Sequence, residues 1–373
     1  METVKKSPAN HQNPAEEIQK LQYKNNNFVS LLKNDLKINT EYFEANIGLF
    51  CALPANKWIE QAAKRPIPKM LFSEFWFENE ICILFADTNV GKSILAVQIA
   101  ESISKGISIP GFKLEANAQK VIYFDFELTD KQFENRYSAN FANHYHFADN
   151  LIRIEINPDP DIPDGMSFET YLNQSIEQAI VQTGTRILII DNITYLRQEN
   201  EKARDALPLM KELKTLKNKY SLSLLILAHT PKRDMSKPLT RNDLQGSKML
   251  INFCDSSFAI GESSTDKSLR YLKMIKARSS ELLYDADNVI VCRICKPENF
   301  LKFEFLNFDY ENNHLRIPSD NDKKQLEDQI AALMAENPDA SSYAIAKQLC
   351  TDDAKFNSFK VKVNRIFKRL QNR

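Results

Sequence analysis

Apolar residues recur along the chain in two rhythms, which predict where strands and helices lie. Short continuous apolar runs predict buried strands, and apolar residues three and four apart predict helices that pack on them. The runs occupy residues 81–85, 120–127, 151–156, 186–191 and 222–229. Helical spacing follows the first run from Lys92 and covers 130–147, 168–182 and 203–219. This alternation predicts an α/β fold, a mostly parallel twisted sheet with helices on both faces.

The pattern changes on either side of this region. Shorter apolar runs beyond residue 255 predict antiparallel strands added at one edge of the sheet, over 257–261, 269–275, 288–294 and 302–308. The expected domains are a disordered arm over 1–26, a helical lead-in over 27–65, the main α/β domain over 66–318 and a basic helical segment over 319–373.

Composition excludes only a few classes of function. Lys+Arg and Asp+Glu are both 49, so the net charge is zero and any nucleic-acid site must be local. No apolar run approaches the ~20 residues that span a bilayer, and residues 1–20 are polar and charged. We therefore expect a soluble cytoplasmic protein with no membrane partner. Cys292 and Cys295 form a single pair, from which we expect no zinc site.

A strand, a tight loop and a helix follow one another between Ile81 and Ala100. The loop has the spacing G-x-x-x-x-G-K-S, with Ala86 in place of the first glycine, which requires a negative φ there. Backbone N–H groups of such a loop bind phosphate, and a surface turn before an ordinary helix is the alternative. The predicted ATP-binding residues are Ala86, Asp87, Thr88, Asn89, Val90, Gly91, Lys92 and Ser93. Lys92 would reach the β- and γ-phosphates, and the Ser93 hydroxyl would hold Mg²⁺.

Polar residues end the buried runs, where open parallel sheets bind their ligands. Asp191 follows four apolar residues and is predicted to hold the magnesium with Ser93; a helix cap or a turn is its alternative role. Strand alternation puts Glu127 and the weaker candidate Asp125 on one face, and Glu127 could polarise the attacking water.

Four further basic positions follow later strands. His229 is placed to sense the γ-phosphate, with Lys232 nearby, although a satisfied strand-end histidine is the alternative. Lys276 and Arg278 end the run 269–275 on one side. They would overload their own chain's site with positive charge, which favours delivery to a neighbour's nucleotide over the alternative of a solvated basic strand edge.

The order of these motifs, with Gln245-Gly-Ser247 before Lys276, resembles the RecA-like ATPases over about residues 66–310. It is most similar to the hexameric replicative helicases of plasmids and to the DnaB-type core. The resemblance implies ATP bound between subunits of a hexameric ring, with Glu127 as catalytic base, His229 as phosphate sensor, and Lys276 and Arg278 as trans fingers. It also implies a DNA-facing loop over 243–249, which contains Lys248. Ala86 and Asn192 depart from the family pattern.

The end of the chain has helical spacing over 324–336, 342–349 and 356–370, which resembles a helix-turn-helix unit. Residues 355–373 contain seven Lys and Arg and no acid, which suits contacts to DNA phosphates. The predicted DNA-binding residues here are Lys360, Lys362, Arg365, Lys368 and Arg369. Docking of a basic helix on the ATPase domain or on a partner is the alternative.

Taken together, the sequence predicts an ATP-hydrolysing DNA motor, a ring helicase of a plasmid or mobile element. It would act on single-stranded DNA in the ring and on duplex DNA through residues 319–373. An ATP-switched DNA-binding regulatory or partition protein and a recombinase-like filament ATPase are the alternatives.

Overall fold

The computed structural model describes residues 45–193, 206–231, 233–244, 247–317, 320–350 and 356–371. Chain contacts divide the protein into two units, residues 1–67 and 68–373. Within the first unit, β1 (Ala45–Ile47) and β2 (Phe50–Ala52) form a hairpin, which α2 (Ala55–Ala63) follows. The predicted lead-in thus contains a hairpin as well as a helix. The predicted arm, residues 1–26, lies outside the described residues.

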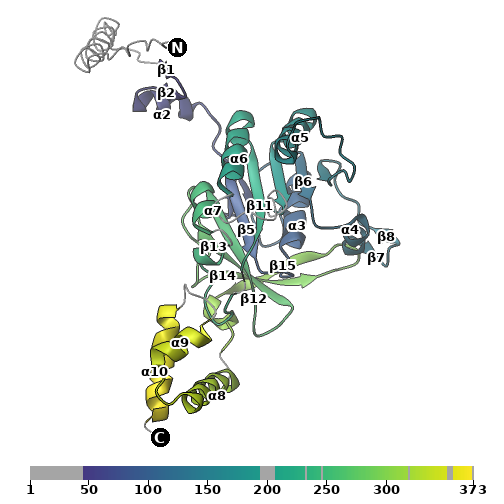
Figure 1. Cartoon of the computed structure of the whole chain (residues 1–373). Coiled ribbons are helices and arrows are strands. Elements are labelled where there is room, and N and C mark those ends of the chain that lie inside the picture. The colour runs from purple at the N-terminus through teal and green to yellow at the C-terminus, as the bar shows by residue number, and fades with distance from the viewer. Residues whose placement is uncertain are drawn as a thin grey trace, which may run out of the picture. The chain divides into compact units, whose positions relative to one another are not determined.

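One nine-stranded sheet organises the second unit, in the order β15-β14-β13-β12-β5-β11-β10-β6-β9 (Figure 1). Its strands are β5 (Ile81–Ala86), β6 (Val121–Asp125), β9 (Leu151–Ile154), β10 (Ile187–Asp191), β11 (Ser223–His229), β12 (Ser256–Glu262), β13 (Leu269–Lys276), β14 (Val289–Cys295) and β15 (Lys302–Asp309). The strands from β9 to β12 run parallel, and β13, β14 and β15 are antiparallel. The predicted fold class, a mostly parallel sheet with antiparallel edge strands, is confirmed.

The antiparallel part begins one strand later than predicted. The run 257–261 was expected to be the first antiparallel strand, but β12 pairs with β5 in parallel. Helix α7 (Ser247–Phe253) lies between β11 and β12, and such a crossover returns the chain in the same direction. The sheet therefore has one more parallel strand at its centre than the sequence pattern indicated.

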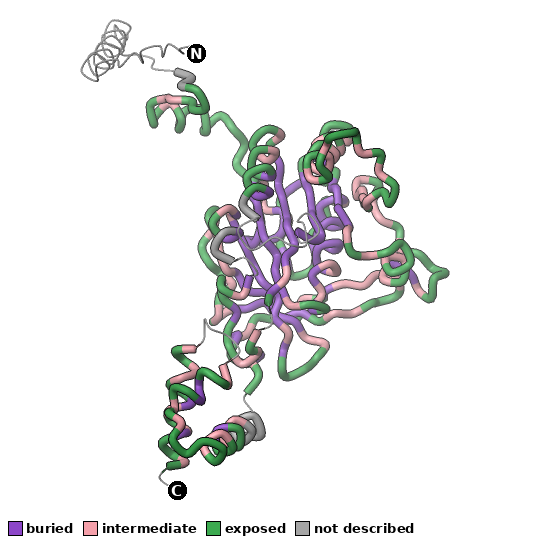
Figure 2. The backbone as a smooth tube through the Cα atoms, viewed as in Figure 1, coloured by how far each residue is buried: buried purple, intermediate pink, exposed green. Residues whose placement is uncertain are grey.

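Two cores lie on opposite faces of the sheet, since the strands are buried on both sides (Figure 2). Helix α3 (Lys92–Lys105) packs on one face, with side chains such as Cys82 and Leu84 of β5. Helices α5 (Phe168–Thr183), α6 (Ala206–Tyr220) and α7 cover the other face, against the alternate side chains Ile81, Ile83 and Phe85. This arrangement matches the continuous apolar runs of the central strands.

The helix predicted over 130–147 is wrong beyond residue 136. Helix α4 (Asp130–Arg136) is followed by a hairpin of β7 (Ser138–Ala139) and β8 (Asn143–His144). Asn140 and Phe141 have positive φ angles of 53° and 57°, which end any helix there. The aromatic residues that imitated helical spacing pack instead in one cluster of Phe133, Tyr137, Tyr145, Phe147 and Phe300.

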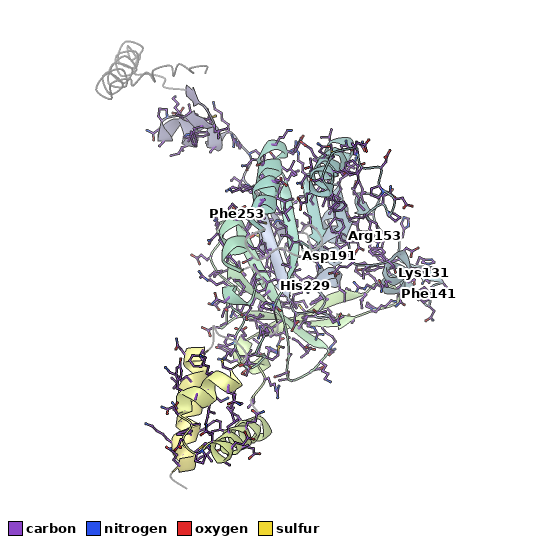
Figure 3. The ribbon with its side chains drawn as sticks, in the orientation of Figure 1. Lys131, Phe141, Arg153, Asp191, His229 and Phe253 are labelled. Atoms are coloured by element: carbon purple, nitrogen blue, oxygen red, sulfur yellow. The ribbon has the colours of Figure 1, made fainter. Side chains whose placement is uncertain are left out.

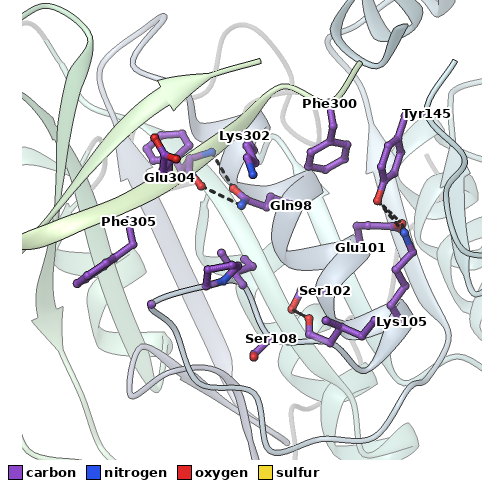
Figure 4. Close-up of a pocket in the computed structure, with 15 residues that line it drawn as sticks. Gln98, Glu101, Ser102, Lys105, Ser108, Tyr145, Phe300, Lys302, Glu304 and Phe305 are labelled. Atoms are coloured by element: carbon purple, nitrogen blue, oxygen red, sulfur yellow. Dashed lines mark hydrogen bonds and ion pairs between the residues drawn. The ribbon is translucent and has the colours of Figure 1, made fainter. Parts of the chain in front are cut away.

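The Gln98 side chain of α3 holds the edge strand β15 by two hydrogen bonds. The Gln98 amide donates to the Phe303 carbonyl at 3.0 Å and accepts from the Phe303 N–H at 2.8 Å, as a neighbouring strand would (Figure 4). A cavity of about 370 Å³ lies beside this contact. In its wall the buried Glu101 pairs with Lys105 at 2.6 Å and accepts from the Tyr145 hydroxyl at 3.1 Å. These polar groups hold the wall together.

Two shorter elements complete the face that α7 covers. The 3₁₀ turns η2 (Arg241–Asp243) and η3 (Glu311–His314) lie after β11 and β15 respectively. A small hairpin of β3 (Met70–Phe72) and β4 (Trp76–Phe77) precedes β5.

The C-terminal segment contains α8 (Asp320–Glu336), α9 (Ser342–Leu349) and α10 (Phe356–Gln371). Their apolar faces share a small core that includes Ile330, Ile345, Val363 and Phe367. Ser341 caps α9, as its side chain accepts from the Ala344 N–H at 3.2 Å. Among the described residues, no helix is both long and apolar enough to cross a membrane.

Candidate functional site

Strand register brings the predicted site residues to one edge of the sheet. Ala86 at the end of β5 pairs with His229 at the end of β11, and Asp191 of β10 pairs with Asp125 of β6. Because these strands are parallel, all four carboxyl ends meet at the same edge. Asp191 and His229 accordingly lie close to each other at the ends of their strands (Figure 3).

The predicted ATP-binding residues run from Ala86, the last residue of β5, through the loop to Lys92 and Ser93, the first two residues of α3. Ala86 is the last residue of β5 and is not among the residues with positive φ, so the missing glycine costs no strain there. The left-handed positions are Asn89, with φ 62°, and Gly91, with φ 110°. At this φ any other residue at Gly91 would be strained, and a Cβ would also lie 2.9 Å from Ile294 Cδ1 and 3.0 Å from Phe303.

Lys92 is buried at the start of α3, and its ammonium group lies inside the loop. It donates to the carbonyls of Ala86 at 3.1 Å and Asp87 at 2.8 Å, and it lies 3.2 Å from His229 Nδ1. Burial lowers the pKa of Lys92, whereas the nearby carboxylates of Asp191, Glu127 and Asp87 oppose this shift. A phosphate oxygen would be a stronger acceptor for this ammonium than the two carbonyls are.

Glu127, Asn192 and His229 form a hydrogen-bonded group next to Lys92. The Asn192 amide donates to Glu127 Oε1 and lies 2.9 Å from His229 Nε2, which is itself 3.3 Å from Glu127 Oε1. The ammonium of Lys92 can only donate, so His229 Nδ1 is the acceptor in their contact. The hydrogen bond from His229 lowers the pKa of Glu127 despite partial burial, so this candidate base is held as a carboxylate.

Asp191 and Ser93 fit a magnesium ion. Asp191 is fully buried; its Oδ2 accepts from the Tyr123 hydroxyl at 2.6 Å, and its Oδ1 has no hydrogen-bond partner among the described residues. Burial raises the pKa of Asp191 to about 6, against the hydroxyls of Ser93 and Tyr123, which stabilise the charged form. A buried carboxylate oxygen without a partner, beside a serine hydroxyl, is the hard oxygen set that Mg²⁺ prefers.

Asp125 has a structural role. Strand β6 ends at this residue, so alternation does not extend to Glu127, and the two carboxylates have different surroundings. Arg153 Nε donates to Asp125 Oδ2 at 2.8 Å, and the N–H groups of Glu127 and Leu128 donate to Oδ1 at 3.2 and 3.0 Å. Asp125 thereby fixes the turn that carries Glu127.

Lys276 and Arg278 lie at the opposite edge of the sheet from the loop. Strand β13 is antiparallel to β12, so its carboxyl end lies beside the amino ends of the parallel strands, where Lys276 pairs with Ser257. Lys276 Nζ donates to the carbonyls of Ile251 at 2.5 Å and Cys254 at 2.7 Å, and Arg278 lies 3.1 Å from Asp255. Neither cation reaches its own chain's loop.

Several predicted site residues lie outside the described residues or have side chains that do. Lys232, Gln245 and Gly246 lie outside the described residues. Lys248 belongs to α7, but its side chain also lies outside them. Lys360, Lys362, Arg365, Lys368 and Arg369 all lie on α10.

Two residues at the site were not assigned from the sequence. Asn192 was noted only as a departure from the family pattern, and Tyr123 was not singled out. Tyr123 lies two positions before Asp125 in β6, so both side chains lie on the same face of the sheet. Asp125 pairs with Asp191 at the end of the neighbouring strand β10. A polar group two residues from a strand end is the signal that could have found it.

Residues 51–235, just under half of the chain, match the family model of the AAA domain. The match includes the loop, Glu127, Asp191 and His229. This part of the chain is therefore similar to the ATPase domains of that family. A crystal structure of a KaiC-like protein from the hyperthermophilic archaeon Pyrococcus horikoshii is similar over 61% of this chain and 90% of its own, at 15% identity and a TM-score of 0.42. No curated protein matches the chain.

The Tyr123 hydroxyl should matter for metal binding, because it orients Asp191. We expect Tyr123→Phe to raise the Mg²⁺ concentration for half-maximal ATP hydrolysis by about tenfold, the usual order of effect when a partner of a metal ligand is removed. Tyr137→Phe is the matched control, since the Tyr137 hydroxyl is buried with no hydrogen-bond partner among the described residues. An unchanged Mg²⁺ requirement in Tyr123→Phe would contradict this role.

Proposed function

We propose that the protein is an ATP-driven DNA motor, a ring-forming replicative helicase of a plasmid or mobile element. The observation that carries the proposal is the hydrogen-bonded group of Glu127, Asn192 and His229 beside Lys92. This group joins Glu127, the candidate base for hydrolysis, to His229. The chain continues from His229 to the predicted DNA-facing loop over residues 243–249. A phosphate on Lys92 and a movement of His229 would therefore be coupled directly.

Hydrolysis would proceed by in-line attack of water on the γ-phosphate. Glu127, held as a carboxylate, orients this water and accepts its proton. Lys92 transfers its hydrogen bonds from the loop carbonyls to the phosphates, and the loop N–H groups hold the rest of the phosphate chain. Ser93 and Asp191 would hold Mg²⁺, which when bound draws negative charge from the phosphates.

Contacts at the base of the segment after His229 support coupling to DNA. Thr230 N–H donates to the Ala86 carbonyl at 3.1 Å, so this segment leaves the sheet beside the loop. Further along, the Leu239 N–H donates to the buried Glu311 at 2.7 Å, and Lys273 bridges Glu311 at 2.5 Å and the Leu239 carbonyl at 2.8 Å. The segment is thus held at both ends of residues 230–239. Because both ends of this segment are held, a shift of His229 would be transmitted to residues 240–249.

Ring assembly is supported by the edge at which Lys276 and Arg278 lie. Since β13 carries Lys276 and Arg278 away from their own loop, they could contact only a nucleotide bound to another subunit. Lys276 would have to leave two carbonyls to do so, and burial lowers its pKa. Arg278 would give up only its pair with Asp255, and its side chain is 54% exposed. An exposed pair of this kind costs little to break, so Arg278 is the better candidate finger.

The cations of α10 support a second contact to DNA. Val363 and Phe367 face the small core, whereas Lys362, Arg365, Lys368 and Arg369 are exposed. These positions recur three or four residues apart and form one basic stripe along the helix. Arg369 also pairs with Glu327, and Lys360 lies 5.6 Å from the centre of the Tyr343 ring. This stripe also favours the second candidate function, a duplex-binding regulator switched by ATP.

Single-stranded DNA should stimulate ATP hydrolysis by the parent protein if it is a motor. In Glu127→Gln, hydrolysis should fall by about a hundredfold or more, the order expected for a lost general base. ATP binding, measured with a labelled nucleotide, should remain, because the loop is intact. Glu281→Gln makes the same Glu-to-Gln change at an exposed position and should hydrolyse ATP as the parent does. Hydrolysis that ignores DNA would favour the regulator, and an active Glu127→Gln would remove Glu127 from the mechanism.

Subunit mixing tests delivery of Arg278 in trans. Arg278→Ala and Lys92→Met should each be nearly inactive alone, the first for want of the finger and the second for want of the phosphate ligand. A mixture should regain activity, because an intact Arg278 from one variant can meet an intact loop of the other. A mixture no more active than its components would argue against a shared site.

The basic stripe should determine the salt dependence of duplex binding. The double variant Lys362→Gln/Arg365→Gln is expected to lower the slope of log K against log salt by about 1.8, since each neutralised phosphate contributes about 0.9. Lys211→Gln/Lys214→Gln removes two exposed lysines from α6 and should leave the slope unchanged. Equal slopes for both variants would instead favour the docking role of α10.

A further inference from the structure

Arg270 connects the antiparallel strands to the phosphate-binding loop. It lies near the start of β13 and is 8% exposed. Its Nε donates to the carbonyl of Val90 at 3.0 Å. Val90 precedes Gly91 in the loop, 180 residues earlier in the sequence, so this contact joins two distant parts of the chain.

The guanidinium group is itself fixed in place. Its Nη1 donates to the carbonyls of Lys267 at 2.6 Å and Leu269 at 2.8 Å. Its Nη2 lies 3.6 Å from Glu262 Oε1 on β12. With four groups around it, the planar guanidinium has little freedom to turn, and the donor to Val90 is held in one direction.

The contact has a consequence for the next N–H group. In a trans peptide the carbonyl oxygen and the following N–H point in opposite directions. Arg270 draws the Val90 carbonyl outward, toward β13, which turns the Gly91 N–H toward the inside of the loop. The N–H groups on the inside of such a loop are the donors that hold phosphate.

The neighbouring strands prevent the loop from relaxing toward them. Gly91 lies against Ile294 of β14 and Phe303 of β15, which would be 2.9 and 3.0 Å from a Cβ at this position. Phe303 is in turn fixed to α3 by both polar atoms of the Gln98 amide (Figure 4). Strands β13, β14 and β15 thus form a wall against the outer side of the loop. All three lie beyond residue 235, outside the part of the chain that matches the AAA domain.

We propose that Arg270 is a positioning residue of the nucleotide site, which orients the Val90–Gly91 peptide so that the Gly91 N–H binds a phosphate of a nucleoside di- or triphosphate. The proposal rests on nucleotide binding by the loop and is independent of DNA. Arg270 contacts neither the attacking water nor the catalytic carboxylate, so its effect falls on nucleotide affinity.

The test compares Arg270→Gln with Arg293→Gln in the full chain. Arg293 is exposed on β14 and lies opposite Leu269, the residue before Arg270, so its substitution removes the same charge from the neighbouring strand. In Arg270→Gln we expect KM for ATP and Kd for ADP to rise about tenfold, as for the loss of one charged hydrogen bond. The kcat at saturating ATP should stay near that of the parent. Arg293→Gln should leave all three constants unchanged.

A purely structural role would give a different result. Partial unfolding reduces the fraction of active protein, which lowers kcat and leaves KM and Kd unchanged. Arg270→Lys retains a cationic donor but lacks the fixed fork of the guanidinium, so KM and Kd should still rise, by a smaller factor than in Arg270→Gln. It serves as the second variant if Arg270→Gln does not fold. Unchanged KM and Kd in either soluble variant, alongside a parent that binds ADP, would overturn the proposal. A parent that binds no ADP would instead overturn nucleotide binding by the loop.

Discussion

The pairing of β5 with β11 is the constraint on which the site depends, because it puts Ala86 opposite His229. From that register, Lys92 at the first turn of α3 lies within 3.2 Å of His229, and His229 within 3.3 Å of Glu127. A slip of one residue in a parallel pair would turn the side chains to the other face of the sheet. Both faces of this sheet are buried, so the register is strongly specified by the two cores.

Buried charge is concentrated where chain segments meet. Asp125 pairs with Arg153 beneath the Glu127 turn, and Glu311 pairs with Lys273 beneath the segment after His229. A buried ion pair gains little stability over apolar residues of similar volume, but an unpaired buried charge is very costly. Such pairs therefore favour one arrangement of the segments over others. That specificity suits a candidate site whose groups lie at or just after the ends of four separate strands.

The parts that sequence reasoning predicted share one property, which is that they depend on local pattern. The apolar runs of β5, β6, β10 and β11 and the helix start at Lys92 were predictable, since burial on both faces leaves a continuous apolar signal. The parallel direction of β12 and the hairpin after α4 were not, because they depend on a crossover and on packing among distant aromatic rings such as Tyr137 and Phe300.

The candidate site divides in the same way. Lys92, Asp191 and His229 could be found because each begins a helix or ends a strand, and Glu127 because it closely follows the end of β6. Asn192 acquires its role only through the amide contacts with Glu127 and His229, and Asp125 loses its predicted role through Arg153. These contacts join residues 28 to 65 positions apart, and no spacing rule along one chain anticipates them.

Strand β13 makes this dependence on distant contacts most evident. Its three cations, Arg270, Lys273 and Lys276, each bind a carbonyl of a different functional segment: Val90 of the loop, Leu239 after His229, and the C-terminal turn of α7. The irregular pairing opposite Ser257 and Phe258 lies between Met274 and Lys276, and a bulge there redirects a side chain that strict alternation would send to the other face. A single strand thus fixes three segments relative to one another. It also leads to Arg278 at the far edge of the sheet, so one strand joins the phosphate-binding loop to the edge that the proposed ring would place against the next subunit.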